Sequence, residues 1–257
     1  MQSEVNESWR VTESDATRIT IYDNISIPSL TQAKIEELQK VYCDSFRYSI
    51  WSTVLQDDNS TLDQERTQAF QDWHEREEGR NWFKDALQFY IDETRKGNCK
   101  LILAEDARSG KIIVGFFVLS ANAFLDHAEK KSGAQLEKII ERIGASKAHT
   151  FYGSEFFVSP DVRGYRGGKA LFGVVRQTLS YAIEKGYTHI VLWTLDRADN
   201  HMIAITKKIG FRSVPDGIFE KGVDLGQMEN GELGFIRNNT GQVAYLYADA
   251  ETFLARL

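Results

Sequence analysis

A short glycine-rich stretch holds the residues of this chain that are most able to do chemistry. Between Glu155 and Ala170 the sequence reads EFFVSPDVRGYRGGKA, with three glycines, two arginines and a lysine after the proline. We expect a strand that ends at Val158, a turn over 159–161 and a helix that starts at about Gly168. Glycines allow close approach of the backbone, and successive N–H groups at a helix N-terminus attract anions. The stretch therefore predicts an anion site, for which a diphosphate is the natural ligand.

Two common phosphate-binding loops do not fit this stretch. The Walker loop needs a glycine, four further residues, and then Gly-Lys followed by Ser or Thr. Here Arg163 stands six positions before Lys169, and Ala170 follows the lysine. The dinucleotide fingerprint Gly-x-Gly-x-x-Gly also fails, because the three glycines have the wrong spacing. A phosphate-binding loop of another type remains.

The run VSPDVRGYRGGKAL, residues 158–171, resembles the acyl-CoA pyrophosphate loop of the GNAT superfamily of N-acetyltransferases. That pattern is Val-x-Pro-x-x-Arg/Gln-Gly-x-Gly-x-Gly/Ala. Arg163, Gly164 and Gly168 fill its places, and Arg166 stands where the middle glycine is usual. Farther along, the family has a strand and then an Asn-containing helix that ends in Gly-Phe. Residues 188–195 and 199–211 (DNHMIAITKKIGF) are similar, so the resemblance covers roughly residues 18–211.

The resemblance implies an α/β fold of the α+β type. Its sheet would be mixed and mostly antiparallel, with two central parallel strands that splay apart, helices on both faces and extra N-terminal helices. Acetyl-CoA would lie in the gap between the splayed strands as a co-substrate. The residues implied to contact it are Phe157, Val158, Arg163, Gly164, Tyr165, Arg166, Gly167, Gly168, Lys169, Ala170 and Asn200.

The resemblance also implies direct attack of an amine on the thioester, and the sequence holds no nucleophile motif such as Gly-x-Ser-x-Gly. An alkyl ammonium with a pKa of about 10 must first lose a proton. Glu155 lies shortly before the loop, where the family often has an acid, and could act as a base through one water. The alternative is that Glu155 faces solvent or pairs with a neighbouring Arg. Thr206 occupies the position of the family's usual Tyr, so we assign no acid for the leaving thiolate.

We therefore expect an N-acetyltransferase that acts on the primary amine of a small molecule. A peptide or protein acceptor is the first alternative. The second is a module that binds coenzyme A without turnover, which Thr206 and Arg166 favour because both depart from the family pattern.

The early aromatic residues and the acidic stretch near the C-terminus can each have either a structural or a functional role. Aromatic residues of the early helices could be core or could line the acceptor site; they are Tyr48, Trp51, Trp73, Trp82 and Phe83. The acidic stretch from Asp216 to Glu232 could be a solvated loop or a rim that attracts a cationic amine.

The elements that must position these residues follow from hydrophobic periodicity. We expect strands at 18–27, 100–106, 111–121, 149–158, 188–195 and 242–248, and helices at 31–46, 63–96 with a break at Gly79, 168–185 and 200–209. Residues 1–17 are predicted to be a flexible leader. Residues 18–257 are predicted to be one GNAT-like domain with helical insertions at about 60–96 and 124–143.

Composition limits the partners. The 31 basic and 37 acidic residues give a net charge of −6, which argues against a nucleic-acid partner. The longest apolar run, 112–119, is far short of the ~20 residues of a membrane span. Cys43 and Cys99 lie among apolar residues and predict buried thiols rather than a metal site. We expect a cytoplasmic enzyme whose partner is a small amine, and we leave a homodimer open.

Overall fold

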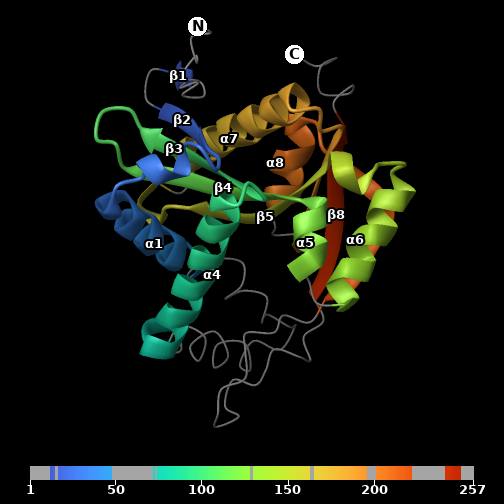
Figure 1. The fold of residues 1–257 in the computed structure, drawn as a ribbon, viewed down its shortest axis with the longest axis horizontal. Coiled ribbons are helices and arrows are strands. Elements are labelled where there is room, and N and C mark those ends of the chain that lie inside the picture. Colours follow the sequence, from blue (N-terminus) through green and yellow to red (C-terminus); the bar gives the residue numbers. More distant parts are fainter. Residues whose placement is uncertain are drawn as a thin grey trace, which may run out of the picture.

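The computed structural model describes residues 12–14, 17–47, 72, 74–127, 130–162, 165–195, 201–221 and 241–249 of the 257-residue chain. An eight-stranded sheet forms its centre, in the order β1-β2-β3-β4-β5-β6-β8-β7 (Figure 1). The strands are β1 Thr12–Ser14, β2 Thr17–Tyr22, β3 Cys99–Asp106, β4 Ile112–Ser120, β5 Thr150–Val158, β6 His189–Leu195, β7 Arg212–Lys221 and β8 Gly241–Asp249.

The helices flank this sheet. The α-helices are α1 Gln32–Arg47, α4 Glu77–Arg95, α5 Ala121–His127, α6 Lys130–Arg142, α7 Tyr165–Glu184 and α8 His201–Ile209. Three short 3-10 helices lie at η1 Ile27–Ser29, η2 Lys147–His149 and η3 Pro160–Val162. Every neighbouring pair of strands is antiparallel except β5 and β6, which are parallel. The mixed, mostly antiparallel sheet predicted from the resemblance is thus confirmed.

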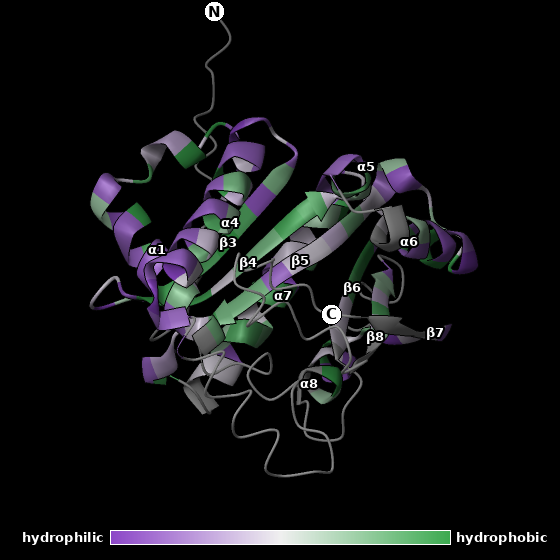
Figure 2. Cartoon of the chain, turned by 90° about the horizontal axis from the view of Figure 1, so that it is seen from below, coloured by the Kyte–Doolittle hydropathy of each residue, from purple (hydrophilic) through white to green (hydrophobic). Residues whose placement is uncertain are grey.

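Alternating side chains of β5 show how the layers are arranged. Phe151 packs in the cluster with α7, Tyr152 packs with α5 and α6, and Phe157 packs with α1 and α4. Helix α7 therefore covers one face of the sheet. Helices α1 and α4 cover one end of the opposite face, and α5 and α6 cover its other end (Figures 1 and 2).

A buried carboxylate fixes α1 against the β3–β4 hairpin. Glu105 of β3 accepts ion pairs from Arg18 at 3.1 Å and from Lys34 of α1 at 2.8 Å. One turn farther along α1, Glu37 accepts a hydrogen bond from the backbone N–H of Ile112 at 2.7 Å. These bonds give the helix a defined position beside the start of β4, next to the end of β5.

Three segments differ from the sequence prediction. Residues 12–14, which lie within the leader predicted over 1–17, form β1 and pair with β2. The helical insertion predicted at about 124–143 consists of two helices, α5 and α6, and the first of them begins three residues earlier, at Ala121. Gly79 lies buried in the first turn of α4 instead of at a break between helices.

The sequence predicts no strand over 212–221, but these residues form β7. This strand is irregular, because its register with β8 shifts between Ser213 and Ile218. Within the shift lie Pro215, which cannot donate to a ladder, and Asp216, whose φ is +48°. Because of this irregularity, β7 has no regular alternation of apolar and polar residues and cannot be recognised as a strand from the sequence.

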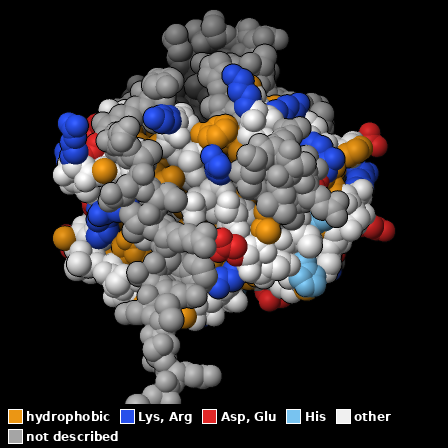
Figure 3. All heavy atoms as spheres, turned by 90° about the horizontal axis from the view of Figure 1, so that it is seen from above, with side chains coloured by type: hydrophobic (Ala, Val, Ile, Leu, Met, Phe, Trp, Pro, Cys, Tyr) orange, Lys and Arg blue, Asp and Glu red, His pale blue; other side chains and the backbone are white. Residues whose placement is uncertain are grey.

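Two further findings concern the distribution of surface charge and the apolar character of the helices. On the face shown in Figure 3, basic side chains are dispersed among neutral ones. Within the ranges given above, no helix combines the length and apolar character needed to cross a bilayer.

Candidate active site

The central feature is a gap between two parallel strands. β5 pairs with β6 from Thr150↔His189 to Gly153↔Leu192, and there the pairing ends. β5 continues to Val158 alongside β4, while β6 continues to Leu195 alongside β8. Among the described residues, the last five of β5 therefore have no ladder partner on the β6 side. Their backbone N–H and C=O groups on that side can bind an extended ligand.

A β-bulge lies at the point where the strands diverge. Phe117 of β4 pairs with Glu155, but the next residue, Val118, pairs with Gly153, so Ser154 is an extra residue in β5. A bulge places two successive side chains on the same face of the sheet. Here both Ser154 and Glu155 point toward α4, where the Tyr90 hydroxyl lies 2.7 Å from Ser154 Oγ and 3.4 Å from Glu155 Oε1.

Glu155 is half-buried and lies among neutral phenols. Burial raises the pKa of Tyr90 well above its ordinary value, and the charge of Glu155 raises it further. The same two causes, in the same order, raise the pKa of Tyr42. Both phenols are therefore protonated at neutral pH, and the Tyr90 O–H can donate to the carboxylate. The sequence left Glu155 either as a base or as a residue that faces solvent or pairs with an Arg. The structure adds a partner that neither alternative named, the Tyr90 hydroxyl, which donates a hydrogen bond to the carboxylate.

Helix α7 follows β5 after a short connection that contains η3. The helix begins at Tyr165, three residues before the predicted start, so Gly167 and Gly168 lie in its first turn. The first four N–H groups of an α-helix have no partner within the helix and carry its positive partial charge. The described part of the loop thus provides outward donors where the resemblance implies a pyrophosphate.

The two described glycines of the loop have different surroundings. A Cβ on Gly167 would lie 2.7 Å from the Val162 carbonyl oxygen, so only glycine fits there. A Cβ on Gly168 would meet no heavy atom within 4 Å. Gly168 therefore leaves open space above the helix N-terminus, which is what close approach of a phosphate requires.

Sequence comparison with protein families matches residues 62–211 to the acetyltransferase (GNAT) family. The chain belongs to the GNAT acetyltransferase family. No protein with a curated description matches it.

Solved structures share the GNAT fold at low sequence identity. A candidate acetyltransferase from Acinetobacter baylyi is 15% identical, over 94% of this chain and 97% of that one, with a TM-score of 0.52. A ribosomal-protein-S5-alanine acetyltransferase from Vibrio fischeri is 10% identical, over 95% and 99%, with a TM-score of 0.51. A variant of spermidine N-acetyltransferase from Vibrio cholerae is 12% identical, over 93% and 97%, with a TM-score of 0.51. Identities this low indicate a common fold only.

The other residues predicted to bind coenzyme A in this GNAT chain are placed as follows. The Phe157 ring is buried, and it packs so closely on Gly115 that a Cβ there would lie 1.9 Å from it. Ala170 is buried as well, so these two residues can contribute only backbone groups. The side chain of Val158 is half-buried and that of Lys169 is exposed.

Several predicted residues lie outside the described part of the structure. For Arg163, Gly164 and Asn200 this holds for the whole residue, and for Tyr165 and Arg166 it holds for the side chain. Tyr48, Trp51 and Trp73 and residues 222–232 of the acidic stretch also lie outside it. Of the early aromatic residues that are described, Phe83 is 4% exposed and belongs to the core, whereas Trp82 is 42% exposed.

Thr206 does not resemble a proton donor for a leaving thiolate. It is buried in α8, and its hydroxyl donates to the carbonyl oxygen of Ile203 at 3.1 Å. A hydroxyl bonded to its own helix is poorly placed to serve a ligand.

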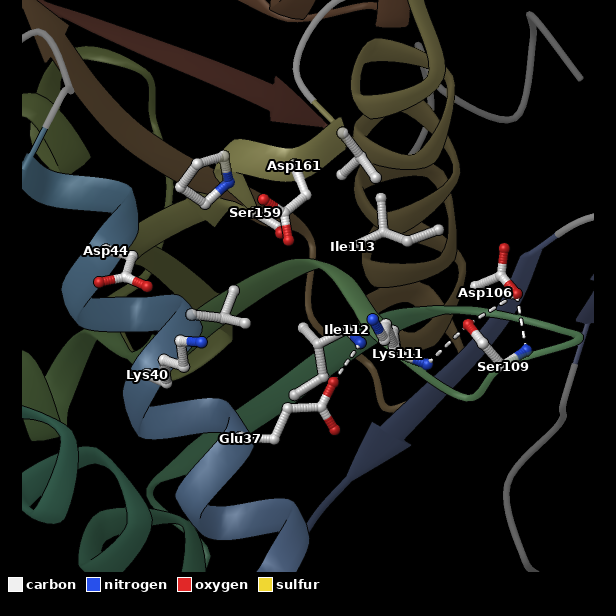
Figure 4. Close-up of a pocket in the computed structure, with 13 residues that line it drawn as sticks. Glu37, Lys40, Asp44, Asp106, Ser109, Lys111, Ile112, Ile113, Ser159 and Asp161 are labelled. Atoms are coloured by element: carbon white, nitrogen blue, oxygen red, sulfur yellow. Dashed lines mark hydrogen bonds between the residues drawn. The ribbon is translucent and has the colours of Figure 1, made fainter.

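A separate pocket of about 530 Å³ lies on the other side of the β5–α7 turn (Figure 4). It lies between α1, the β3–β4 hairpin and η3, and charged side chains of both signs line it, among them Lys40, Asp44, Lys111 and Asp161. None of the predicted site residues that the structure describes lines this pocket. It is therefore distinct from the gap between β5 and β6.

Two residues near Glu155 were not anticipated. The sequence alone indicates no functional role for Tyr90 or Ser154. The β-bulge in β5 brings both residues next to Glu155. The bulge depends on how β5 pairs with β4, and this pairing leaves no recognisable pattern in the sequence. Among the described residues, no group of three or more His, Cys, Asp or Glu side chains could hold a metal ion.

Proposed function

We propose that this protein is an acetyl-CoA-dependent N-acetyltransferase that acts on the primary amine of a small molecule. The observation that carries the proposal is the gap between β5 and β6, which has Glu155 on its rim and the N-terminus of α7 at its end. Membership in the GNAT family supports the reaction type.

The residues around the gap fit the coenzyme. Unpaired backbone groups of 154–158 would bind its pantetheine arm, and the N–H groups of 165–168 would bind its diphosphate, aided by Arg163 and Lys169. The open space at Gly168 supports this fit. As co-substrate, acetyl-CoA supplies the activated thioester.

Glu155 would act as the base. An alkyl ammonium, with a pKa of about 10, is almost fully protonated at neutral pH and cannot attack. Glu155 Oε takes one proton from the ammonium nitrogen, directly or through one water, which frees the nitrogen lone pair for the thioester carbonyl. After attack the bond between the carbonyl carbon and the sulfur breaks, and coenzyme A leaves as a thiolate. The nitrogen gives its second proton to solvent and the thiolate takes one proton from solvent, so the products are an N-acetyl amide and the thiol of coenzyme A. We assign no acid, because a thiol with a pKa of about 8.5 can leave as thiolate.

The surroundings of Glu155 favour a small acceptor over a peptide. On the same face of the sheet, α4 reaches the bulge through Tyr90, and α5 packs Phe124 on Tyr152 at a ring distance of 3.9 Å. The acceptor would therefore meet β5 between two helical walls (Figure 2). The known acceptors of structural neighbours include a ribosomal protein and spermidine, so both classes belong in the test.

The test follows thiol release from acetyl-CoA with a panel of small amines and N-terminal peptides. We expect turnover with at least one small amine and an upward shift of the melting temperature with coenzyme A, since a ligand of the native state stabilises it. Turnover with peptides alone would move the acceptor to proteins. Binding of coenzyme A without turnover on any acceptor would favour a regulatory module, in line with the buried Thr206.

A further inference from the structure

We propose that Tyr90 is a positioning residue, which together with Ser154 holds the Glu155 carboxylate in the orientation that accepts the substrate proton. This inference rests on the proposed function, in which Glu155 is the base. It adds a hydrogen-bond chain from α4 to the bulge of β5.

The Tyr90 hydroxyl has a fixed position. The residue is 8% exposed, and its ring stacks on Phe117 at a centroid distance of 4.6 Å and an interplanar angle of 15°. Phe117 is the β4 partner of Glu155 in the sheet. The ring that carries the hydroxyl therefore packs on the residue paired with the carboxylate, so the distance between the two groups is defined by the sheet itself.

The direction of the hydrogen bonds follows from the number of protons. A carboxylate only accepts, a phenol has one proton to donate, and a serine hydroxyl can donate and accept. All three groups are satisfied when Ser154 donates to Tyr90 at 2.7 Å and Tyr90 donates to Glu155 Oε1 at 3.4 Å. The chain then polarises toward the carboxylate and strengthens the weaker, longer bond.

Within the described part of the chain, three tyrosines from three elements lie in electrostatic contact with Glu155. They are Tyr42 of α1, Tyr90 of α4 and Tyr152 of β5. Burial comes first among the causes that raise the pKa of each phenol, so all three remain neutral over the range in which the enzyme would work. Of these three, Tyr90 is the one with a hydrogen bond to the carboxylate in the described structure.

Tyr42 offers a matched control. Like Tyr90 it is a buried phenol on the same face, 2% exposed, with an edge contact to Phe117 at 6.4 Å. No hydrogen bond joins its hydroxyl to a described residue. Tyr42→Phe therefore removes a phenol oxygen on the same face of the sheet as Tyr90, but it does not remove a hydrogen bond to Glu155.

The experiment compares wild type, Tyr90→Phe and Tyr42→Phe in steady-state turnover from about pH 6 to about pH 10, across the range in which base catalysis is visible. For Tyr90→Phe we expect kcat to fall about 3- to 10-fold and the acidic limb of the profile to move up by about half a unit, because the carboxylate loses a donor. The KM for acetyl-CoA should stay the same. Tyr42→Phe should keep the wild-type profile.

A second measurement does not need turnover. With ¹³C-labelled glutamate, the carboxyl resonance that disappears in Glu155→Gln identifies Glu155, and its titration midpoint can be followed in each variant. We expect the midpoint to rise in Tyr90→Phe and to stay in Tyr42→Phe. If Tyr90→Phe does not fold, Ser154→Ala should move the midpoint in the same direction by less.

The outcomes separate the two proposals. A wild-type protein that turns over, with Tyr90→Phe and Tyr42→Phe giving the same profile and midpoint, overturns the positioning role alone. A wild-type protein that turns over no amine overturns the proposed function, while the titration still decides whether Tyr90 acts on Glu155.

Discussion

One extra residue in β5 determines what Glu155 can do. In a regular strand Ser154 and Glu155 would point to opposite faces of the sheet. The register shift after Phe117 turns both toward α4, where Tyr90 binds them. The carboxylate thereby reaches the face between α4 and α5 while its backbone still borders the gap to β6.

Removing this carboxylate should produce a pH-dependent defect. For Glu155→Gln we expect kcat/KM to fall about 10²- to 10³-fold at neutral pH, within the range for loss of a general base. The loss should shrink toward high pH, where free amine is abundant. Glu141→Gln, an exposed acid of α6, is the control and should match wild type. A loss of the same size at every pH would remove Glu155 from the role of base.

At the scale of elements, α7 joins the candidate diphosphate site to the body of the sheet. Its buried side chains, such as Val174 and Leu179, pack in the central cluster with β3 and β4. Gly186, two residues beyond its end, has a φ of +79°, and the Tyr187 N–H donates back to the carbonyl oxygen of Ala182 at 2.8 Å. The helix is thus fixed along its length and at its end.

The same substitution at the two ends of α7 should have opposite effects. Gly168→Ala meets no neighbour and improves helix propensity, so the free energy of unfolding should rise by up to about 1 kcal/mol. Gly186→Ala forces a side chain into the left-handed region and should cost about 1 kcal/mol. Urea unfolding measures both.

The ligand response of these variants completes that test. Gly168→Ala should raise the KM for acetyl-CoA, because its methyl group occupies the space above the helix N-terminus, whereas Gly186→Ala should not. An unchanged KM in Gly168→Ala would argue against diphosphate binding at this turn.

Glu93 connects the end of α4 with β3 and α5. Its side chain is 1% exposed and accepts from Lys96 at 2.6 Å and Asn98 at 2.8 Å, and His127 lies 3.6 Å away. Burial alone would raise the pKa of Glu93, but hydrogen bonds from Lys96 and Asn98 outweigh it and hold the pKa below its ordinary 4.5. A lowered folded-state pKa stabilises the protein above 4.5, and this contribution is lost as the pH falls through the folded value.

The acid dependence of stability should therefore weaken in Glu93→Gln. Urea unfolding between about pH 7 and about pH 3 should show a flatter decline below the ordinary pKa of a carboxyl group than in wild type. Asp85→Asn, an exposed acid of the same helix, should keep the wild-type slope. Equal slopes in all three proteins would contradict the assigned role of Glu93.

For the whole molecule, strong local patterns predicted most of the sheet. The apolar runs of β4 and β6 and the amphipathic face of α7 can be recognised because burial and period coincide in them. β7 could not be predicted, since Pro215 and its shifted register break the alternation. The loop was found through its glycines, but the pairing of Tyr90 with Glu155 depends on residues 65 positions apart, which only the folded sheet brings together.

The strand order gives the last described segment a structural role. β8 lies between β6 and β7 and pairs with both, over His189–Leu195 on one side and Arg212–Lys221 on the other. A chain that stops at residue 240 should therefore lose two ladders at once. We expect it to be insoluble or to lack a cooperative thermal transition, as measured by the soluble fraction and circular dichroism. A chain without residues 1–11 should retain both, and a stable, soluble chain of 240 residues would contradict this expectation.

The position of β8 also bears on how the protein is made. During synthesis, β1 to β6 leave the ribosome well before 241–249, so one border of β6 stays open while translation finishes. An incomplete nascent chain would present this border to chaperones and to other chains. Completion of the sheet by β8 would then make assembly of the candidate active site a late event, restricted to molecules whose translation has reached this strand.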